Sequence, residues 1–477
     1  MEIYVTIRGR DDLSGQIYRQ LRSGIVEGRL VAGERLPSTR DLATQLGVSR
    51  KTTLDVFERL TSEGYLRSRP GDGTFVADGL IRVPTHPADA TKHQARMQAI
   101  WSSMPVQLSM PRHDVPYLFD FLGGVTDKRL FPFDTWRRCI NHAVRLQARG
   151  RGQYRDPAGE QELRLAVSRY LSFSRAVASN WQDVIVTQGA QQAIDLIARV
   201  VLRPGEVVAV EEPGYPPARA AFVAAGAKIV GVPVDDQGLI VEQLPKKARL
   251  VYVTPSHQFP LGMPMSLERR VALLEWAQRQ GAVIIEDDYD GEFRFEGRPV
   301  EPLKSLDRAG LVAYVGTFSK TIFPELRVGY VVPPASLNEA IQKAKQISDW
   351  HSCSLTQAAL AKFMLDGDFA KHLRRMHKHY EDRRRTLVSS LQNELAEWFE
   401  PLIPAAGIHM TARLKGSLKE KHLSGGALDA SIGLYGISAF YMNQPTQEGL
   451  IFGYGGVESG TDGGAAKKMR VRVLEMG

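Results

Sequence analysis

A lysine and an arginine follow an apolar segment in the middle of the chain. In Tyr314–Tyr330, Lys320 comes directly after Ser319, and Arg327 lies seven residues further on. A lysine in a partly dry pocket is a good nucleophile, because desolvation disfavours its charged form and the neutral amine attacks aldehydes. Ser319 and Arg327 would then bind an anionic group such as a phosphate. The alternative is a surface lysine after a strand, which an isolated Ser-Lys pair does not exclude.

A second stretch, upstream, ends in carboxylates. Three β-branched residues from Val283 precede an acidic run that contains Asp287, and Tyr289 follows. If the partner is pyridoxal phosphate, Asp287 at the end of its strand pairs with the protonated pyridine nitrogen, which makes the ring an electron sink. A solvated acidic rim or a metal site are the alternatives, but no His or Cys stands nearby in sequence. Asp287 followed by Lys320 on successive strands predicts that pyridoxal phosphate forms a Schiff base with Lys320. Tyr289 would then hydrogen-bond the ring hydroxyl.

Three earlier strand-like segments also end in polar or aromatic residues. Val184–Thr187 runs into a small-residue turn that opens a helix at Ala190 and Gln191, where free N–H groups and the helix dipole favour a phosphate. The strands from Val207 and Val251 end near Tyr215 and His257, which singly are ordinary loop residues. Because open α/β sheets bind ligands where their strands end, the five segments together predict one cofactor site.

Composition limits the class of protein. The 477 residues are 43% hydrophobic and 24% charged, enough for one or two large cores. The formal charge of +8 permits contact with nucleic acid without proving it. Cys139 and Cys353 have no paired spacing, which argues against a disulfide framework or zinc module. With no apolar leader and no run of roughly 18 apolar residues, we expect a soluble cytoplasmic protein.

The first 76 residues have the pattern of a small helical domain. Apolar residues recur every four positions from Leu13, which predicts a helix up to Gly28. Ser38 is expected to cap a short helix, Gly47 to make a turn, and Ser49 to cap a second helix that runs to about Glu63. This is helix-turn-helix spacing, and the second helix presents three residues to DNA in its first turn. They are Arg50, Lys51 and Thr52.

A glycine-rich hairpin is predicted to follow as a wing. Its two short strands lie within Gly64–Val76, where Gly73 lets the backbone approach a groove and Arg67 and Arg69 can contact phosphates. Residues 1–76 carry 12 basic and 10 acidic side chains, so net charge does not distinguish DNA binding from a small protein-protein module. The placement of the basic residues favours DNA binding.

Residues 13–76 resemble the winged helix of the GntR superfamily. The resemblance rests on Gly33–Arg40, Gly47–Arg50 and Gly71–Val76. It implies DNA contacts from a set of polar and basic residues and one glycine. They are Arg35, Arg40, Ser49, Arg50, Lys51, Thr52 and Gly73.

Periodicity fades between residues 78 and 117, a stretch that contains five prolines and three histidines. We predict a linker here between a DNA-binding domain, 1–77, and an effector domain, 118–477, with a short helix near Lys92–Trp101. A glycine-rich loop and a final basic helix, Ala465–Leu474, are predicted at the C-terminus.

Residues from about 119 to 477 resemble fold-type I aminotransferases, an α/β fold. Joined to the winged helix-turn-helix, they resemble the MocR/GabR-type transcription regulators. The resemblance implies the roles already given to Lys320, Asp287 and Tyr289. It also implies that Tyr215 stacks on the cofactor ring. It places Ala190, Gln191, Ser319 and Arg327 around the phosphate. Tyr154, in a Tyr-x-x-x-x-Gly turn, matches a tyrosine that reaches the neighbouring subunit's cofactor, which implies a domain-swapped homodimer.

Two segments depart from the aminotransferase pattern. Thr254–Gln258 replaces an Asn-Pro loop with a form that resembles the regulators, in which the loop histidine or glutamine faces the cofactor. Gly449–Gly456 lacks the arginine that binds a substrate carboxylate, and Arg219 and Arg413 are the alternatives for that role.

These observations predict a regulator that binds DNA through its winged helix and senses an amine, an amino acid or pyridoxal phosphate itself. A catalytically active aminotransferase with an accessory N-terminal module is the alternative. A regulator that has lost cofactor binding is a third hypothesis.

Overall fold

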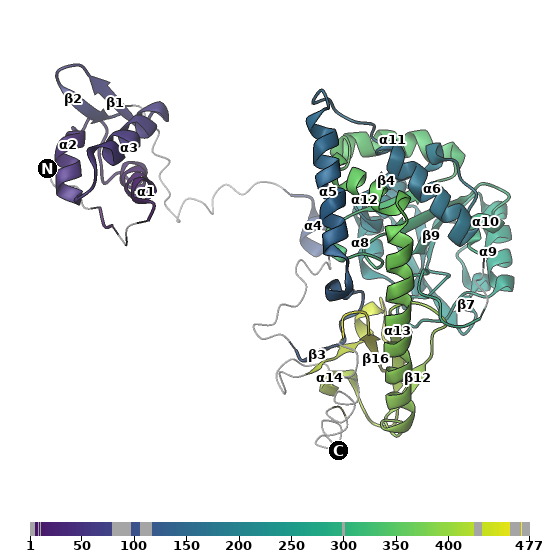
Figure 1. The fold of residues 1–477 in the computed structure, drawn as a ribbon. Helices are drawn as coiled ribbons and strands as arrows, with labels where there is room; N and C mark the ends of the chain where they lie inside the picture. The colour runs from purple at the N-terminus through teal and green to yellow at the C-terminus, as the bar shows by residue number, and fades with distance from the viewer. Residues whose placement is uncertain are drawn as a thin grey trace. The chain divides into compact units, whose positions relative to one another are not determined.

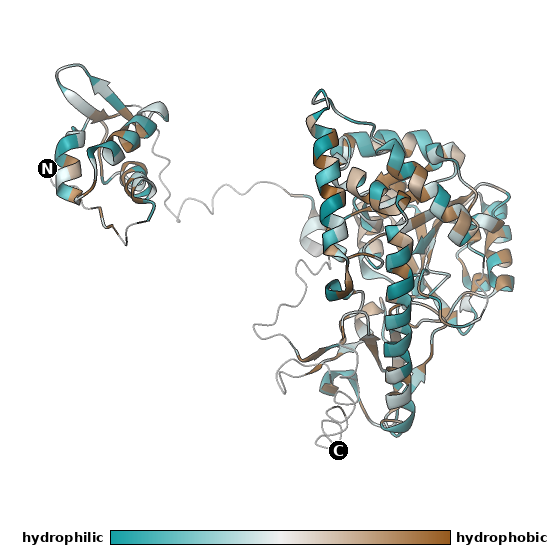
Figure 2. Cartoon of the chain, viewed as in Figure 1, coloured by the Kyte–Doolittle hydropathy of each residue, from teal (hydrophilic) through white to brown (hydrophobic). Residues whose placement is uncertain are grey.

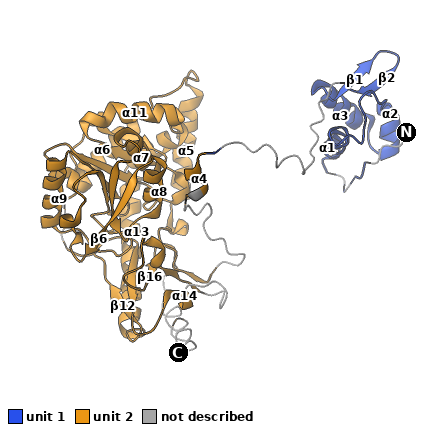
Figure 3. Cartoon of the chain, turned by 180° about the vertical axis from the view of Figure 1, so that it is seen from behind, with its two compact units in different colours: residues 1–97 blue, residues 98–477 orange. Residues whose placement is uncertain are grey.

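The computed structural model describes residues 5–7, 9, 11–78, 97–104, 117–297, 301–423, 432–457 and 469. The chain forms two compact units, Met1–Met97 and Gln98–Gly477 (Figure 3). Most of the predicted linker and of the predicted C-terminal helix lies outside the described residues.

The first unit is a three-helix domain with a β-hairpin (Figure 1). The Ser38 side chain accepts a hydrogen bond from the backbone N–H of Asp41, and Ser49 accepts one from Thr52, so both helices begin as predicted. Gly47 ends the first of them with φ of 64°, a conformation that glycine adopts without steric cost. The elements are α1 (Leu13–Val26), α2 (Thr39–Leu46), α3 (Arg50–Ser62) and the antiparallel wing strands β1 (Leu66–Arg69) and β2 (Gly73–Val76).

An eight-stranded sheet forms the centre of the second unit, in the order β4-β11-β10-β9-β8-β5-β6-β7. Strands β10, β9, β8, β5 and β6 are parallel. Strand β11 pairs antiparallel with β10 and β4, so β4 runs with the parallel set. All five strands predicted to lead into the site therefore end at one edge of this sheet. Their bounds are β4 (Ile185–Thr187), β5 (Val207–Glu212), β6 (Lys228–Asp235), β7 (Gly238–Leu239), β8 (Ala248–Val253), β9 (Val283–Asp288), β10 (Val312–Thr317) and β11 (Gly329–Val332).

Helices cover both faces of the sheet (Figure 1). On β9, Ile285 packs in a cluster with α7, α8 and α11, whereas its neighbour Ile284 packs in another cluster with α9. Figure 2 shows hydrophobic residues along the buried strands and hydrophilic ones along the long helix α13. The helices are α4 (Ala99–Ser103), α5 (Phe133–Ala148), α6 (Gln161–Arg175), α7 (Ala190–Val201), α8 (Pro216–Ala224), α9 (Leu267–Gln280), α10 (Leu303–Leu306), α11 (Ala335–Asp349), α12 (Ser354–Leu365) and α13 (Asp368–Asn393).

A smaller sheet, in the order β12-β13-β16-β15, lies beside α13. The segment before Gly124 joins this region, because the backbone N–H of Gly453 donates to the carbonyl oxygen of Phe121 at 2.8 Å. Among the described residues, no helix is long and apolar enough to span a membrane. The remaining elements are β3 (Phe119–Asp120), β12 (Phe399–Leu402), β13 (His409–Leu414), α14 (Glu420–Leu423), β14 (Ile432–Gly433), β15 (Tyr435–Gly436) and β16 (Gly449–Gly453).

Candidate functional site

Lys320 follows β10 and is held inside the second unit by a glycine carbonyl. Its Nζ donates a hydrogen bond to the oxygen of Gly124 at 2.8 Å. Burial lowers the pKa of the Lys320 amine, and the negative charges of Asp290 and Asp287 oppose that shift. Gly124 has φ of +77°, and a Cβ there would lie 2.5 Å from Nζ, so glycine is what leaves room for the lysine. A partly buried amine with a lowered pKa is the nucleophile that Schiff-base chemistry needs.

Asp287 is a buried carboxylate with one oxygen bonded and the other open. Its side chain shares a face of β9 with Ile285, the face that α7 and α8 cover. Its Oδ2 accepts a hydrogen bond from the hydroxyl of Tyr252 on β8 at 2.7 Å. Its Oδ1 has no hydrogen-bond partner among the described residues. Burial raises the pKa of Asp287 to about 7, while the Tyr252 hydrogen bond lowers it.

An open, buried carboxylate oxygen calls for a donor. The protonated ring nitrogen of pyridoxal phosphate is such a donor, and Lys320 is the amine that its aldehyde needs. These two residues therefore fit the cofactor that the sequence predicts. When bound, that group supplies an electron sink for chemistry at the attached amine.

The start of α7 lies against Arg327. Gly189, the residue before this helix, has φ of +84°, and a Cβ there would lie 2.6 Å from Nη2 of Arg327. Arg327 also lies 3.4 Å from the Ser319 hydroxyl, to which its Nη1 donates. Free N–H groups at a helix start, beside a guanidinium and a hydroxyl, match the chemistry of a phosphate site. Ala190 and Gln191 begin this helix, and Gln191 has a buried Oε1 without a partner in the described chain.

Aromatic side chains border the Asp287 side of the site. Tyr215 directly precedes α8, and burial, followed by the charge of Asp287, raises its pKa to about 12. Its ring centroid lies 5.6 Å from that of Phe259, with the rings nearly perpendicular. Phe259 lies 6.2 Å from the ring of Tyr289. Tyr215 packs against the buried cluster on the Asp287 face of the sheet, and its stacking on the ring stays a prediction.

His257 belongs to a buried cluster with Asp290 and His409. Its Nδ1 lies 3.0 Å and 3.1 Å from the two carboxylate oxygens of Asp290. The His409 ring is 4.3 Å from the His257 ring, and burial lowers the pKa of His409 to about 3. The hydroxyl of Tyr289 donates to the carbonyl oxygen of His257 at 2.8 Å. The predicted residues His257 and Tyr289 thus contact each other.

The three ligand atoms of this cluster lie within 4.8 Å of one another, a grouping that metal ions use. No histidine neighbours the acidic run in sequence, and the fold supplies His257 from the loop after β8 and His409 from β13. The sequence gives no signal of this convergence, because His257, Asp290 and His409 lie far apart along the chain.

The other groups considered from sequence have partners elsewhere. Arg219 donates to the carbonyl oxygen of Phe440 at 3.0 Å and lies 3.6 Å from Glu212. Arg413 donates to the side-chain oxygen of Gln447 at 2.7 Å. The Gln258 side chain donates to two loop carbonyls rather than toward Lys320. Neither arginine is free for a carboxylate in this arrangement.

Tyr154 is 75% exposed, and its ring packs 4.6 Å from that of Trp350, also exposed. No described contact joins it to Lys320 of its own chain. A role at another subunit's cofactor stays a prediction.

On the winged helix, basic residues are exposed at the starts of α2 and α3. Arg40 lies in the first turn of α2, and Arg50 and Lys51 begin α3. Arg35 packs against the wing, because a Cβ on Gly73, where φ is +114°, would lie 3.0 Å from its Nε. The wing residue Arg69 lies 4.9 Å from the ring of Phe75, and Arg67 pairs with Asp78. The domain thus presents the starts of α2 and α3, their basic residues and the wing. Contact with a DNA groove and its phosphates requires these features.

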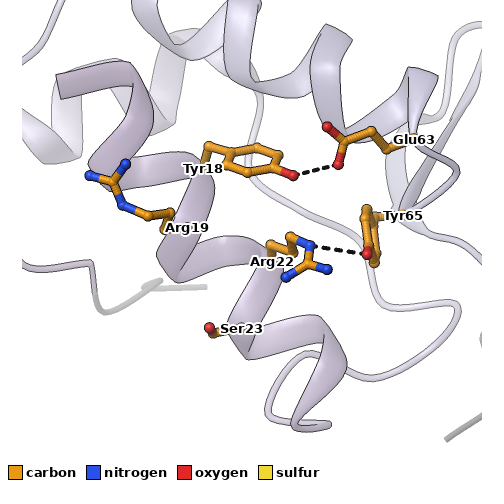
Figure 4. A pocket seen from close by; sticks show the side chains of 6 residues that line it. All are labelled: Tyr18, Arg19, Arg22, Ser23, Glu63 and Tyr65. Carbon is orange, nitrogen blue, oxygen red and sulfur yellow. Dashed lines mark hydrogen bonds between the residues drawn. The ribbon is translucent and has the colours of Figure 1, made fainter. Parts of the chain in front are cut away.

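A shallow hollow lies at the other end of α3 (Figure 4). Arg22 donates to the hydroxyl of Tyr65 at 3.0 Å, and the hydroxyl of Tyr18 donates to Glu63. Arg59 stacks 3.8 Å over the Tyr18 ring. These contacts tie α1 to the last turn of α3 and to the residues that follow it, so we assign them to the stability of the domain.

Comparisons with known proteins agree with this architecture. Residues 13–76 match the family "Bacterial regulatory proteins, gntR family", and residues 125–445 match "Aminotransferase class I and II". The chain is 37% identical over 450 residues to the probable rhizopine catabolism regulatory protein MocR of Rhizobium meliloti, covering 94% of this chain and 90% of that one. The chain belongs to the MocR-type transcription regulators.

Other regulators match most of the chain, across both of its units. The chain is 35% identical to the HTH-type regulator TauR of Rhodobacter capsulatus, over 81% of each chain. It is 29% identical to the pyridoxine biosynthesis regulator PdxR of Corynebacterium glutamicum, over 94% of this chain and 92% of that one. A GntR-type DNA-binding domain and an aminotransferase-like domain therefore form one regulator.

Solved aminotransferases share the fold of the second unit. Pyrococcus horikoshii kynurenine aminotransferase matches with a TM-score of 0.69 and 26% identity, over 81% of this chain and 96% of that one. The α-aminoadipate aminotransferase LysN of Thermus thermophilus, solved with N-(5'-phosphopyridoxyl)-L-leucine, matches with a TM-score of 0.69 and 26% identity, over 75% and 92%. The fold is that of pyridoxal-phosphate enzymes.

Proposed function

We propose that this regulator binds pyridoxal phosphate on Lys320, binds duplex DNA through its winged helix, and changes its DNA binding when an effector occupies the Lys320 site. The effector is an amine or amino acid, or pyridoxal phosphate itself. The protein acts in the cytoplasm as a homodimer in which Tyr154 reaches the partner subunit's cofactor.

One observation carries the proposal. The buried Oδ1 of Asp287 lacks a partner among the described residues, and Lys320 is a partly buried lysine that follows the neighbouring strand β10. Leaving a carboxylate oxygen unpaired in a dry site costs free energy, which a cationic donor would offset. A ring with a protonated nitrogen at one end and an aldehyde at the other satisfies both residues.

Each further residue has one task in this proposal. Ser319, Arg327 and the N–H groups of Ala190 and Gln191 bind the phosphate, Tyr215 covers the ring, and Tyr289 and His257 lie at the hydroxyl side. Arg35, Arg40, Ser49, Arg50, Lys51, Thr52 and Gly73 contact DNA.

An amine effector acts by competing with Lys320 for the aldehyde. The Lys320 amine, when it is not attached to the cofactor, would be able to donate to the Gly124 carbonyl, as it does in this structure at 2.8 Å. The contacts of Lys320 then differ between the two states, as a ligand-driven switch requires.

The test joins two measurements on the full chain. Purified protein loaded with pyridoxal phosphate should show a visible absorption band that Lys320→Ala lacks. Specific binding to its own upstream region should respond when amines or free pyridoxal phosphate are titrated. If the band is identical in Lys320→Ala, the cofactor assignment is wrong; if DNA binding is absent or ignores every cofactor state, the regulatory part is wrong.

A catalytic aminotransferase is the second candidate, favoured by the fold shared with kynurenine aminotransferase. Arg219 and Arg413, the two arginines considered for a substrate carboxylate, have other partners in the described part of the chain, so neither supplies the carboxylate clamp of such an enzyme in this arrangement. Turnover of an amino donor and a keto acid at an enzyme-like rate would establish this function instead.

A further inference from the structure

A small hollow in the second unit is lined by three arginine side chains. It lies where the end of α6, the start of α9 and the segment after β9 meet. Its free volume of about 10 Å³ has room for one water molecule or one monatomic ion. None of its lining residues is assigned above to the cofactor or to DNA, so the hollow is separate from both sites. The lining includes Arg175, Ser256, Arg270, Gly291, Arg294 and Ala406.

Arg175 leaves one buried donor unused. Its side chain is 10% exposed, and its Nη1 donates to the carbonyl oxygen of Gly291 at 3.0 Å. Its Nη2 donates to the hydroxyl oxygen of Ser256 at 3.0 Å and pairs with the carboxylate of Asp288. Its Nε is buried and has no hydrogen-bond partner among the described residues. A buried N–H without an acceptor costs free energy, which an anion or a water molecule in the hollow would offset.

Arg294 is the one of the three arginines whose charge has no carboxylate partner in the described chain. Asp288 pairs with Arg175, and Glu286 lies 3.7 Å from Arg270. Arg294 forms no ion pair with a described residue, and its buried Nε has no hydrogen-bond partner among them. A half-buried guanidinium therefore lines the hollow without a counterion from this part of the protein.

The positive charges of the three arginines act on one another. Burial lowers the pKa of Arg270 and of Arg294, and the charge of Arg175 lowers both further. Glu292, the acid next to Gly291, instead accepts a hydrogen bond from the hydroxyl of Tyr170 at 3.1 Å and does not line the hollow. Because charges interact strongly where water is largely excluded, a negative ion among these guanidinium groups would be stabilised more than a water molecule.

We propose that this hollow binds a single chloride ion between Arg175 and Arg294. The Ser256 hydroxyl accepts from Arg175, so its own hydrogen is free to donate to the ion. The small volume favours a monatomic anion over phosphate or a carboxylate. Arg294 also forms an isolated antiparallel bridge with Ala406, so the ion would stabilise the contact between the segment after β9 and the segment before β13. This inference does not depend on the cofactor.

The experiment is thermal unfolding of the full-length protein at constant ionic strength, with sodium gluconate replaced stepwise by sodium chloride. The wild-type Tm should rise by roughly 2 °C and then level as the site fills, because a ligand that binds the folded state stabilises it. Arg294→Met keeps an unbranched side chain without the charge, and it should lose most of this rise.

Arg279→Met is the matched control. Arg279 lies in the last turn of α9, is 62% exposed and lies 3.8 Å from Glu275, so it has the same charge and helix as Arg270 but no part in the hollow. Its Tm should rise with chloride as much as that of wild type. Loss of the rise in Arg294→Met alone would support the site.

Two results of this experiment would overturn the proposal. A wild-type Tm that ignores chloride would mean that the hollow holds water alone, and an equal rise in wild type and Arg294→Met would place the ion elsewhere. If Arg294→Met does not fold, crystals of the wild-type protein grown in sodium bromide answer the same question. An anomalous peak between Arg175 and Arg294 is expected, and its absence there would also overturn the proposal. Each of these failures leaves the proposed function untouched.

Discussion

The hydroxyl of Tyr252 donates a 2.7 Å hydrogen bond to Oδ2 of Asp287 and leaves Oδ1 of that carboxylate open. The two side chains come from β8 and β9, neighbouring parallel strands, so the sheet itself sets their distance. Burial raises the pKa of Asp287 to about 7, and Tyr252 partly offsets this effect. Tyr252 thereby favours the ionised form that a protonated ring nitrogen needs.

Tyr252→Phe should weaken the binding of pyridoxal phosphate about tenfold, close to the value of a hydrogen bond to a charged group. Loss of the Tyr252 hydrogen bond raises the pKa of Asp287 further and lets its side chain rotate. A cofactor titration followed by absorbance measures this change. Tyr380→Phe is the control, because it removes a buried hydroxyl from a different core cluster than the one on the Asp287 face of the sheet. Equal affinities in wild type and Tyr252→Phe would contradict the role given to Tyr252.

Asp287→Asn should stabilise the cofactor-free protein more at pH 8 than at pH 5. The pKa of Asp287 is raised from 3.8 to about 7 in the folded protein, so between these values the native state keeps a proton that the unfolded chain has lost. Wild-type stability therefore falls as pH rises through this window, by up to about 4 kcal/mol, and the variant lacks this contribution. The difference in Tm between the two proteins should grow from about pH 4 to pH 7 and then level. A difference that shrinks with rising pH would count against the raised pKa.

Gly124→Ala should abolish the absorption band of the bound cofactor. The added Cβ would lie 2.5 Å from Nζ of Lys320, and φ of +77° is strained for alanine. Gly205→Ala is the matched control, since Gly205 has φ of +89° and nothing within 4 Å of the added Cβ. Each variant should lose about 1–2 kcal/mol of stability from the backbone alone. The band should persist in Gly205→Ala, and its persistence in Gly124→Ala would show that Lys320 does not need this space.

Much of this site could be predicted from the sequence, because strand ends in an α/β sheet converge. Lys320, Asp287 and Tyr215 each follow an apolar run, and parallel pairing brings such positions to one edge. Ser38 and Ser49 similarly marked the true starts of α2 and α3.

Tyr252 and Gly124 were not predictable in the same way. Tyr252 lies inside a strand and reads as a core residue, and Gly124 is 196 positions from the lysine it accommodates. Asp290 and His409 meet because the start of β13 packs against the segment after β9, where the backbone N–H of Ile408 donates to Asp290 at 3.1 Å. Such contacts form through packing between residues that are far apart in the chain. The local periodicity of the sequence does not predict them.

Replacing Arg50 and Lys51 together with alanine should weaken DNA binding strongly and lower the slope of log affinity against log salt by about 2, if both contact phosphates. Both are exposed at the start of α3. Arg19→Ala is the control, because Arg19 lies on α1, is exposed and pairs with Asp12 at 3.0 Å. Electrophoretic shifts at several salt concentrations measure the slopes. Specific binding that survives the double substitution would place the DNA contact elsewhere.

The most direct measurement is the mapping of the covalent cofactor. Protein loaded with pyridoxal phosphate is reduced with borohydride, digested, and analysed by mass spectrometry, with Lys320→Ala treated in parallel. We expect a stoichiometric phosphopyridoxyl label on the peptide that contains Lys320 and none above background in the variant. A label spread over surface lysines, or equal labelling of both proteins, would contradict the assignment of Lys320 as the cofactor-binding residue.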